Sequence, residues 1–269
     1  MYVVFDVGGT QTRLGYSANG RSLVRVETRP TDASEAGLGA FAAELAKWVS
    51  QYQPEAVAGG LPGQVDAEGA LRAATHLGGW EGQPVGLCLE QAVGMSIGLE
   101  NDAALAGLAE ARLGAGRGKR IMAYITISTG VNGVLVVDGK IEPTATGFEV
   151  GRELVPGPDG VTISWEELVS GAAVRQRYGR APREIKDPVV WAHVARDVAL
   201  GLYNLVMVWS PEVIVLGGPM MHDIPVVEVR AALEVMLGTY TAWPELRLAA
   251  LGDERGLLGA LEWLRLRQP

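Results

Sequence analysis

A carboxylate beside a glycine turn is the first combination in this chain that could carry out chemistry. Asp6 and Val7 precede the run Gly8-Gly9-Thr10, and apolar residues flank it on both sides. Glycine reaches the positive φ values of two-residue turns, so the run predicts a tight hairpin. The same glycines let backbone N–H groups approach an anion, and Thr10 adds a hydroxyl donor, which makes a phosphate cradle the alternative. Taken alone, the run favours the plain hairpin.

The first half of the chain alternates strands and helices around this turn. Apolar residues at helical spacing predict helices over 35–52, 85–93 and 103–113. The pair Asn101-Asp102 provides an N-cap for the last of these helices, and Gly114 ends it. Gly59–Gly63 is a loop by composition. Short apolar runs predict strands at 2–6, 13–17, 23–28, 56–60 and 96–100.

The second half repeats this order of elements. Strands are expected at 121–127, 134–137, 140–142, 212–216 and 246–251, with a turn at 128–133. Helices are expected to start at Ser164, where Glu167 completes a capping box, at Asp187 before Pro188, and at about Glu254. The shared order, from 3 to 60 and from 124 to 218, indicates a weak internal duplication. Two similar α/β lobes would face each other across a cleft, where small ligands usually bind.

Composition excludes several classes of protein. The chain has 269 residues, 48% of them hydrophobic and 20% charged, as in a soluble globular protein. A formal net charge of -8 with no basic block argues against nucleic-acid binding. The single Cys88 excludes an intramolecular disulfide and a Cys-cluster zinc site, and suits a reducing cytoplasm. No signal peptide is apparent, and the apolar stretch Val198–Trp209 is too short to span a bilayer.

Six short motifs in one order resemble those of a known family. Each is weak alone, but their order and spacing resemble the ROK family (repressors, open reading frames and sugar kinases) of the actin, sugar kinase and heat-shock protein superfamily. The resemblance covers nearly the whole chain. It implies a two-lobed α/β ribonuclease H-like (actin-like ATPase) fold with an interlobe cleft, and an ATP-dependent sugar kinase. The motifs are 6–10, 60–65, 100–104, 128–131, 147–151 and 216–218.

The resemblance assigns nucleotide contacts to the glycine turns. In the family, one turn of each half clasps the ATP phosphates, so the phosphate cradle becomes the favoured interpretation of the opening run. Asp6 would lie near Mg²⁺, mainly through water, because Mg²⁺ keeps much of its hydration shell. Gly217-Gly218 would let the nucleoside lie against backbone. The positions that match the two turns are Gly8, Gly9, Thr10, Thr129 and Gly130.

Asp102 is the implied catalytic base. Family members use the aspartate of an Asn-Asp-Ala motif to accept the proton of the attacking sugar hydroxyl. Phosphoryl transfer depends on positioning and charge neutralisation, so one carboxylate, Mg²⁺ and two turns suffice. The alternative role of Asp102 is a helix N-cap worth roughly 1 kcal/mol. A helix N-terminus also favours the ionised form, which would weaken the carboxylate as a base.

The resemblance also implies sugar contacts. Asn101, Glu149 and Glu166 would accept hydrogen bonds from hydroxyls, and Gly63 would allow close backbone approach. Glu149 is otherwise a solvated loop charge, and Glu166 an exposed glutamate of a first helical turn. Trp80 is expected in the core, and we interpret His76, His193 and His222 as structural.

One departure from the family concerns zinc. Many members have a zinc-binding histidine after Gly-Glu-Ile-Gly and then three cysteines. Here Arg152 takes the histidine position, and 153–164 contains no cysteine, so no structural zinc is expected. Arg152 would donate to a sugar hydroxyl or favour a substrate with a negative group; otherwise it is a surface charge paired with Glu153.

Four functions compete. The first is an ATP- and Mg²⁺-dependent hexose kinase acting on glucose, and the live alternative is a kinase for fructose, mannose or an N-acetylhexosamine. A transcriptional repressor and a silent sugar sensor fit less well. We expect a small lobe at 1–108, completed by a helix at 254–269, and a large lobe at 109–253. The expected partners are a sugar and ATP, with no nucleic acid or membrane, in a cytoplasmic homo-oligomer (a dimer or tetramer).

Overall fold

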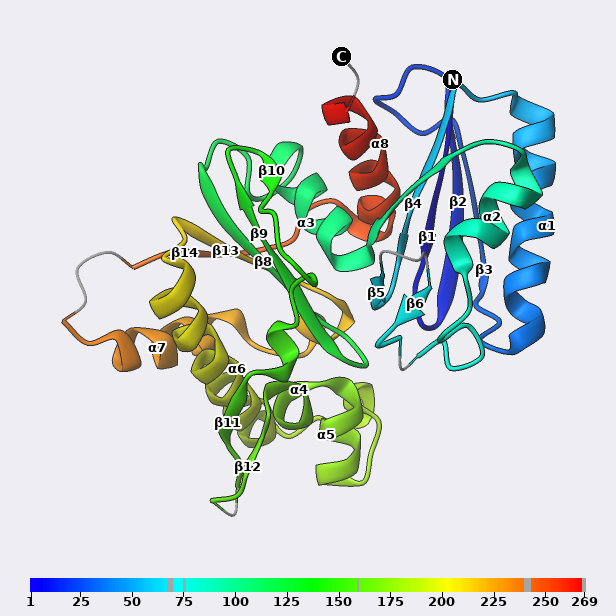
Figure 1. The fold of residues 1–269 in the computed structure, drawn as a ribbon. Helices are drawn as coiled ribbons and strands as arrows, with labels where there is room; N and C mark the ends of the chain where they lie inside the picture. The colour runs from blue at the N-terminus through cyan, green and yellow to red at the C-terminus, as the bar shows by residue number, and fades with distance from the viewer. Residues whose placement is uncertain (67–69, 75, 159, 240–242, 268–269) are drawn as a thin grey trace. The chain divides into compact units, whose positions relative to one another are not determined.

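The computed structural model contains two compact units, each an α/β fold (Figure 1). Unit 1 comprises Met1–Arg112, Pro143–Gly147 and Leu251–Pro269, and unit 2 comprises Leu113–Glu142 and Phe148–Ala250. The residues described are 1–66, 70–74, 76–158, 160–239 and 243–267.

Unit 1 is built on a five-stranded sheet with the order β3-β2-β1-β4-β7. The first three strands form an antiparallel meander, while β4 and β7 run parallel to β1. Both parallel strands therefore end at the same edge as β1, which carries Asp6. A small separate sheet pairs β5 with β6. The strands are β1 (Tyr2–Val7), β2 (Gln11–Ser17), β3 (Arg25–Pro30), β4 (Ala56–Leu61), β5 (Gln64–Val65), β6 (Leu71–Arg72) and β7 (Ile97–Asn101).

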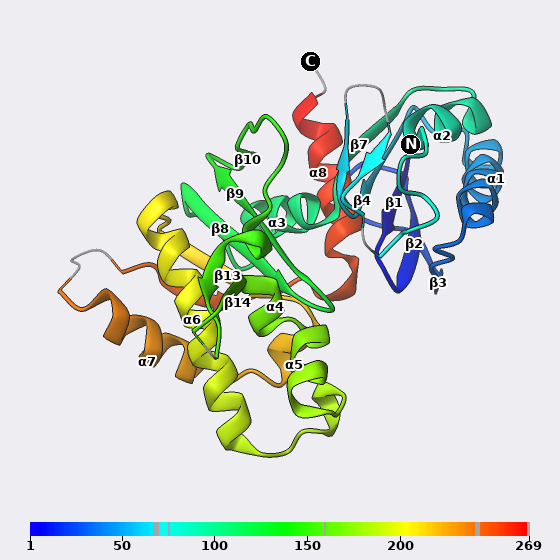
Figure 2. The same ribbon diagram turned by 60° about the horizontal axis from the view of Figure 1, so that its bottom comes forward.

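Helices cover both faces of this sheet, as Figures 1 and 2 show. α1 (Glu35–Tyr52) and α2 (Val85–Val93) pack together on one face, and α3 (Asp102–Arg112) and α8 (Arg255–Arg267) pack together on the other. α1 buries Leu38, Phe41 and Leu45 at helical spacing, so its apolar stripe supplies one side of the core. Trp80 is buried there as expected, stacked on Phe41. The short helix η4 (Gly252–Glu254) leads into α8.

Unit 2 repeats the same topology, with the order β10-β9-β8-β13-β14. β8 and β9 form an antiparallel hairpin, and β13 and β14 run parallel to β8. The duplication inferred from the order of elements is therefore present in the connectivity of the two sheets. The strands are β8 (Ile121–Ile127), β9 (Val131–Val137), β10 (Lys140–Ile141), β13 (Val213–Gly217) and β14 (Glu245–Leu248), with a separate hairpin of β11 (Leu154–Pro156) and β12 (Thr162–Ser164).

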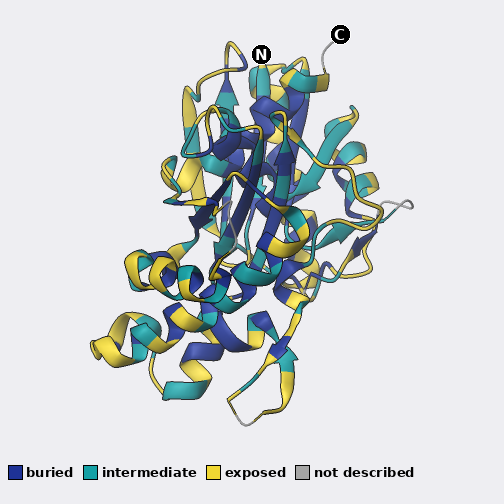
Figure 3. Ribbon diagram, turned by 90° about the vertical axis from the view of Figure 1, so that its left-hand side faces the viewer, coloured by how far each residue is buried: buried dark blue, intermediate teal, exposed yellow. Residues whose placement is uncertain are grey.

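The core of unit 2 lies between its sheet and four helices. α6 (Pro188–Trp209) is the longest and packs against α7 (Val226–Leu237), and α4 (Trp165–Val169) also contacts α6. α5 (Gly171–Tyr178) follows α4 after a break at Ser170, where one continuous helix was expected. Figure 3 shows buried residues concentrated along the sheets and the inner faces of the helices. The remaining short helices are η1 (Val150–Arg152), η2 (Pro182–Glu184) and η3 (Pro219–His222).

Most predicted helices match the structure, while one predicted turn differs. The capping box of Ser164 and Glu167 is present, and Asp187 caps α6 with Pro188 at its first position. β9 begins at Val131, so the turn expected at 128–133 is only three residues long. None of the helices in the described ranges is both long and apolar enough to cross a membrane.

Candidate active site

The turn between β1 and β2 is braced on its inner side and exposed at its tip. The N–H of Gly8 donates to Gln11 O (2.9 Å), so that group closes the hairpin. The Thr31 hydroxyl donates to Gly8 O (2.7 Å), and the Thr31 N–H donates to Thr10 O (3.0 Å). Gly9 and Thr10 are exposed. The turn is thus a rigid hairpin whose tip can present donors to an anion, which reconciles the two interpretations of this run.

His76 lies against this turn. A Cβ built on Gly9 would be 2.8 Å from the His76 Cβ, so only glycine fits at position 9 without a shift of the histidine. His76 is itself exposed and not a core residue. Its place beside the turn was not foreseen from sequence, because it lies 67 positions after Gly9 and no motif contains it.

Asp6 is at the end of β1, surrounded by cations and by the first turn of α8. Its carboxylate lies 3.7 Å from Arg13 Nη1, and its side chain is 14% exposed. A Cβ on Gly256 would be 2.5 Å from Asp6 Cγ, so the glycine allows α8 to approach this closely. Burial raises the pKa of Asp6 to about 6, while the charges of Arg13 and Arg255 act in the opposite direction. Neither arginine was singled out from sequence.

Asp102 follows β7 and is the first residue of α3. Parallel pairing aligns Asp6 with Gly60, and Gly60 with Glu100, which brings the ends of β1 and β7 to the same edge of the sheet. Burial raises the pKa of Asp102 to about 7, and the charge of Asp6 adds to the rise. Backbone hydrogen bonds, including 2.8 Å from Ala103 N to Asp102 Oδ1, act in the opposite direction.

The N-cap role expected for Asp102 belongs to its neighbour. Asn101 Oδ1 accepts from the N–H of Ala104 (3.1 Å), three residues on, as an N-cap does. The same side chain donates from Nδ2 to Gly63 O (2.9 Å). Gly63 has φ +83°, and a Cβ there would lie 2.4 Å from Arg72 O. Asn101 therefore holds the Gly63 loop against the start of α3. At Asp102, burial raises the pKa more than the backbone N–H groups of the helix N-terminus lower it.

In unit 2 the turn Ser128–Gly130 joins β8 to β9 and is held by α5. The first N–H groups of α5, those of Gly171 and Ala172, donate to Ser128 O (2.7 Å) and Thr129 O (3.4 Å). Thr129 is exposed and Gly130 is buried. As in unit 1, the backbone on the inner side of the turn is fixed while its threonine stays open to solvent.

The Gly217-Gly218 pair lies beside this turn for reasons of packing. A Cβ on Gly217 would be 2.4 Å from Tyr124 Oη, and one on Gly218, which has φ +89°, would be 2.2 Å from Ile127 O. Both glycines are thus required by the approach of β13 to β8. Because Ile127 is the last residue of β8, the pair and the Ser128–Gly130 turn are adjacent within unit 2.

The three sugar-contact candidates of unit 2 are held near the start of β9. Glu166 Oε2 accepts from Val131 N (2.7 Å), so Glu166 is not a free first-turn glutamate. Arg152 Nε donates to Glu149 Oε2 (3.1 Å), with side chains 61% and 31% exposed. The alternative pairing of Arg152 with Glu153 is not found, because Arg152 pairs with Glu149 and Glu153 Oε1 is buried.

The carboxylates of unit 1 are ligands of the kind that Mg²⁺ uses. Among the described residues, no group of three or more His, Cys, Asp or Glu side chains could hold a metal ion. Mg²⁺ is usually held by one or two carboxylates and completes its shell with water and phosphate oxygens. Asp6 supplies such a carboxylate, and because burial raises its pKa, a cation beside it would stabilise its ionised form.

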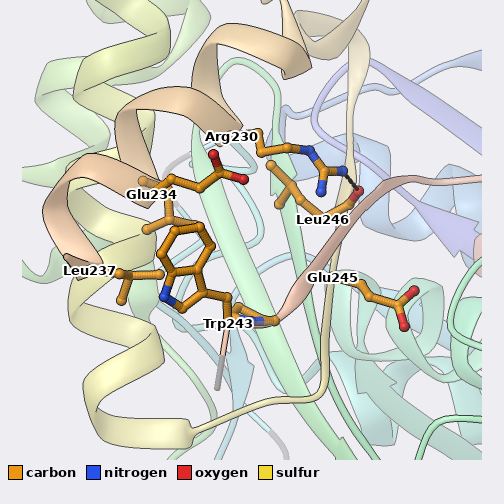
Figure 4. Close-up of a pocket in the computed structure, with 8 residues that line it drawn as sticks. Arg230, Glu234, Leu237, Trp243, Glu245 and Leu246 are labelled. Carbon is orange, nitrogen blue, oxygen red and sulfur yellow. Dashed lines mark hydrogen bonds between the residues drawn. The ribbon is translucent and has the colours of Figure 1, made fainter. Parts of the chain in front are cut away.

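A pocket of about 180 Å³ in unit 2 is separate from these residues (Figure 4). It lies between α7 and the start of β14, where Arg230 donates to Leu246 O (2.7 Å). Glu245 pairs with Val213 at the beginning of β13, whereas Gly217 is at the end of β13. The pocket is therefore at the opposite end of the sheet from the glycine pair, and it contains none of the candidate site residues.

Comparison with known proteins identifies the family to which this chain belongs. A sequence model of the ROK family matches residues 2–267, and the chain belongs to that family. It is 32% identical to the ROK hexokinase of Thermus thermophilus, with a TM-score of 0.81 over 99% of each chain. It is 25% identical to a ROK family glucokinase of Streptomyces griseus solved with glucose and AMPPNP, with a TM-score of 0.82 over 98% of this chain and 99% of that one.

A longer relative is also similar. The bifunctional enzyme NanE/NanK of Brucella melitensis is 32% identical over 97% of this chain, and this chain spans about half (53%) of its length. The solved neighbours have the actin-like ATPase fold of ROK sugar kinases, so the fold expected from the motifs is confirmed.

Proposed function

We propose that this protein is an ATP-dependent sugar kinase that transfers the γ-phosphoryl group of ATP to a hexose hydroxyl. The observation that carries the proposal is the pair Asp6 and Asp102 at the end of the parallel strands of unit 1, each with a raised pKa. Family membership and the likeness to a glucokinase that binds glucose and AMPPNP support it.

Asp102 acts as the general base in this proposal. Its carboxylate accepts the proton of the sugar hydroxyl while the hydroxyl oxygen attacks the γ-phosphorus, and the bond to the β-phosphate oxygen breaks to release ADP. A base works best when its pKa is near the working pH, and the pKa of Asp102 is raised to about 7. Mg²⁺, when held by Asp6, supplies neutralisation of the phosphate charge.

The two glycine turns contact the nucleotide in this proposal. The tip of the first turn and Thr129 of the second donate to phosphates, and the nucleoside lies near Gly218. That Gly217 and Gly218 are already required by packing does not conflict with this role. The proposed phosphate contacts are Gly8, Gly9, Thr10, Thr129 and Gly130, and the nucleoside contacts are Gly217 and Gly218.

Sugar recognition is proposed for the polar groups that remain. Glu149, Arg152 and Glu166 contact hydroxyls directly, whereas Asn101 and Gly63 form one fastened loop that gives the sugar a fixed backbone surface. The acceptor is glucose or a close relative; fructose, mannose and N-acetylhexosamines are the alternatives. A non-catalytic sugar sensor is the remaining alternative, and the base-like environment of Asp102 argues against it.

The proposal includes the protein's assembly and setting. The lobes span residues 1–108 with the helix 254–269, and residues 109–253. The protein works in the cytoplasm as a homo-oligomer, a dimer or tetramer, on small molecules and without nucleic acid or membrane.

An ADP-release assay tests this function. ATP and Mg²⁺ are supplied with a panel of hexoses and N-acetylhexosamines, and a reaction without sugar serves as the blank. We expect at least tenfold stimulation by one sugar, which also names the acceptor. ATP binding without stimulation by any sugar would contradict the kinase and favour the sensor.

A further inference from the structure

The loop that carries Glu149 and Arg152 is clamped to the rest of unit 2 through its backbone. A Cβ on Gly151 would be 2.2 Å from Val131 O, so η1 lies directly on the start of β9. At the end of η1, Glu153 O accepts from Trp165 N (2.8 Å), the first residue of α4. The backbone contacts of residues 150–153 therefore determine where Glu149 and Arg152 lie.

The Glu153 side chain points inward although both of its neighbours are exposed. Arg152 and Leu154 are 61% and 71% exposed, respectively. Glu153 Oε1 is fully buried and has no hydrogen-bond partner among the described residues. A Cβ on Gly201 would lie 2.5 Å from this oxygen and 2.1 Å from Cε2 of the buried Trp165. Gly201 thus leaves the space on α6 that the carboxyl group and the indole share.

The surroundings of Glu153 disfavour a charge. Burial raises the pKa of Glu153 to about 7, and a hydrogen bond from the Asn204 side chain acts in the opposite direction. Among the residues that the structure describes, no cation pairs with it to offset the cost of burying a carboxylate. The charged side chains on the elements packed around it, none of which shifts this pKa appreciably, are Glu149, Arg152, Glu166, Glu167, Arg196 and Asp197.

We propose that Glu153 is a positioning residue for the sugar-contact loop: its uncharged carboxyl group seats against Gly201 and holds Glu149 and Arg152 in place, and its ionisation releases them. This deepens the proposed function and rests on it for the role of the loop in sugar binding. Ionisation would leave a charge on a carboxyl group whose buried Oε1 has no hydrogen-bond partner among the described residues, and moving η1 away from α6 would bring that oxygen to water.

Ionisation of Glu153 should lower the affinity for the sugar as pH rises. It should therefore raise KM for the sugar and leave kcat unchanged. Glu153 contacts no reacting group, so its ionisation changes only the fraction of protein whose loop is in place. Above its pKa that fraction falls up to tenfold per pH unit. Glu153→Gln keeps the shape of the carboxyl group and cannot ionise, so it should remove the pH dependence.

Amide hydrogen exchange of the ligand-free protein tests whether ionisation of Glu153 releases the loop. Protection factors of residues 148–153, corrected for the intrinsic rate, are measured from pH 6 to 8.5 in wild type, Glu153→Gln and the control Glu228→Gln, an exposed glutamate of α7. We expect at least a fivefold loss of protection in wild type and the control, and none in Glu153→Gln. The same loss in all three proteins, or no loss in any, would overturn the inference.

A second variant separates this mechanism from simple destabilisation. Asn204→Leu removes a hydrogen bond that lowers the pKa of Glu153, so the loop transition should move to higher pH. General loosening of unit 2 would move it to lower pH, and that result would also overturn the inference. This readout remains available if Glu153→Gln does not fold.

Kinetics test the functional half. The KM for the sugar should rise about tenfold between pH 6.5 and 8.5 in wild type and stay constant in Glu153→Gln, with matching kcat profiles. A pH-dependent difference in kcat alone would contradict a positioning role. If no sugar supports turnover, the proposed function fails, and the exchange experiment still decides whether Glu153 positions the loop.

Discussion

Asp6 and Asp102 interact electrostatically at one edge of the unit 1 sheet, and the charge of Asp6 raises the pKa of Asp102. Asp6 ends β1, and Asp102 follows β7, two strands away. The arginines near Asp6 favour its ionised form, so Asp6 ionises first and Asp102 retains its proton to higher pH. The two carboxyl groups therefore differ in basicity because of their surroundings, which suits one to a cation and the other to a proton.

The pH dependence of turnover should follow Asp102. A general base acts only when ionised, so kcat/KM should rise tenfold per pH unit below about pH 7, the pKa of Asp102. Above that pH it should level off in Glu153→Gln, whereas in wild type the rise in KM proposed above should make it fall again. The rate is measured from pH 5 to 9 with both substrates well below their KM, so that the free enzyme is reported. A flat profile between pH 5 and 8 would mean that no group with a raised pKa is the base.

The same shift should cost stability at high pH. Folding raises the pKa of Asp102 from 3.8 to about 7, so its protonated form is favoured in the folded state. The stability this provides is complete below pH 3.8 and is lost as pH rises toward 7. Asp102→Asn should therefore be more stable than wild type at pH 8 by about 1–2 kcal/mol, allowing for partial solvation. Urea unfolding without Mg²⁺ measures this, and the gain should vanish near pH 4.

Gly256 should be needed for activity although it contacts no substrate in the proposal. A Cβ at this position would lie 2.5 Å from Asp6 Cγ, so Gly256→Ala must displace the carboxylate or the first turn of α8. We expect kcat/KM to fall about 100-fold, as a displacement of 1 Å can cause. Gly39→Ala on α1 is the matched control, because its Cβ would meet nothing within 4 Å. Equal activity of the two variants would show that α8 does not position Asp6.

Metal removal should separate zinc from magnesium. The segment 153–164 has no cysteine, and β11 and β12 form a hairpin that buries Val155. A zinc-selective chelator should leave both turnover and the unfolding temperature unchanged, whereas EDTA should abolish turnover until Mg²⁺ is restored. Loss of activity with the zinc chelator, reversed by zinc, would contradict the account of this loop.

Local sequence patterns were enough to predict most helices and strands. They did not predict contacts between residues far apart in the sequence. The helix predicted at 35–52 and the strand at 121–127 match α1 and β8, because each has a complete apolar periodicity and a clear boundary. The break between α4 and α5 was missed. Ser170 ends α4 and caps α5. In the sequence alone, a serine at such a break cannot be told from a serine within a continuous helix.

In the candidate site, too, local motifs identified some residues, and long-range packing revealed the others. Motif order identified Asp6 and Asp102, but nothing local indicated that Arg13 and Gly256 would lie near Asp6, or His76 near Gly9. Sheet pairing brings Arg13 to Asp6, and the return of α8 brings Gly256 there. Glu153 looked like a surface charge beside Arg152. Its burial depends on Gly201, 48 positions later, which only packing reveals.

The most direct test of the account is a comparison of wild type with Asp102→Asn, measuring sugar-dependent ADP release and ATP affinity on the same preparations. Glu81→Gln, an exposed glutamate of unit 1, is the control. The account predicts that Asp102→Asn loses about 10³-fold in kcat, within the range for a general base, while ATP affinity stays within a few-fold. Near-normal turnover by Asp102→Asn would contradict it.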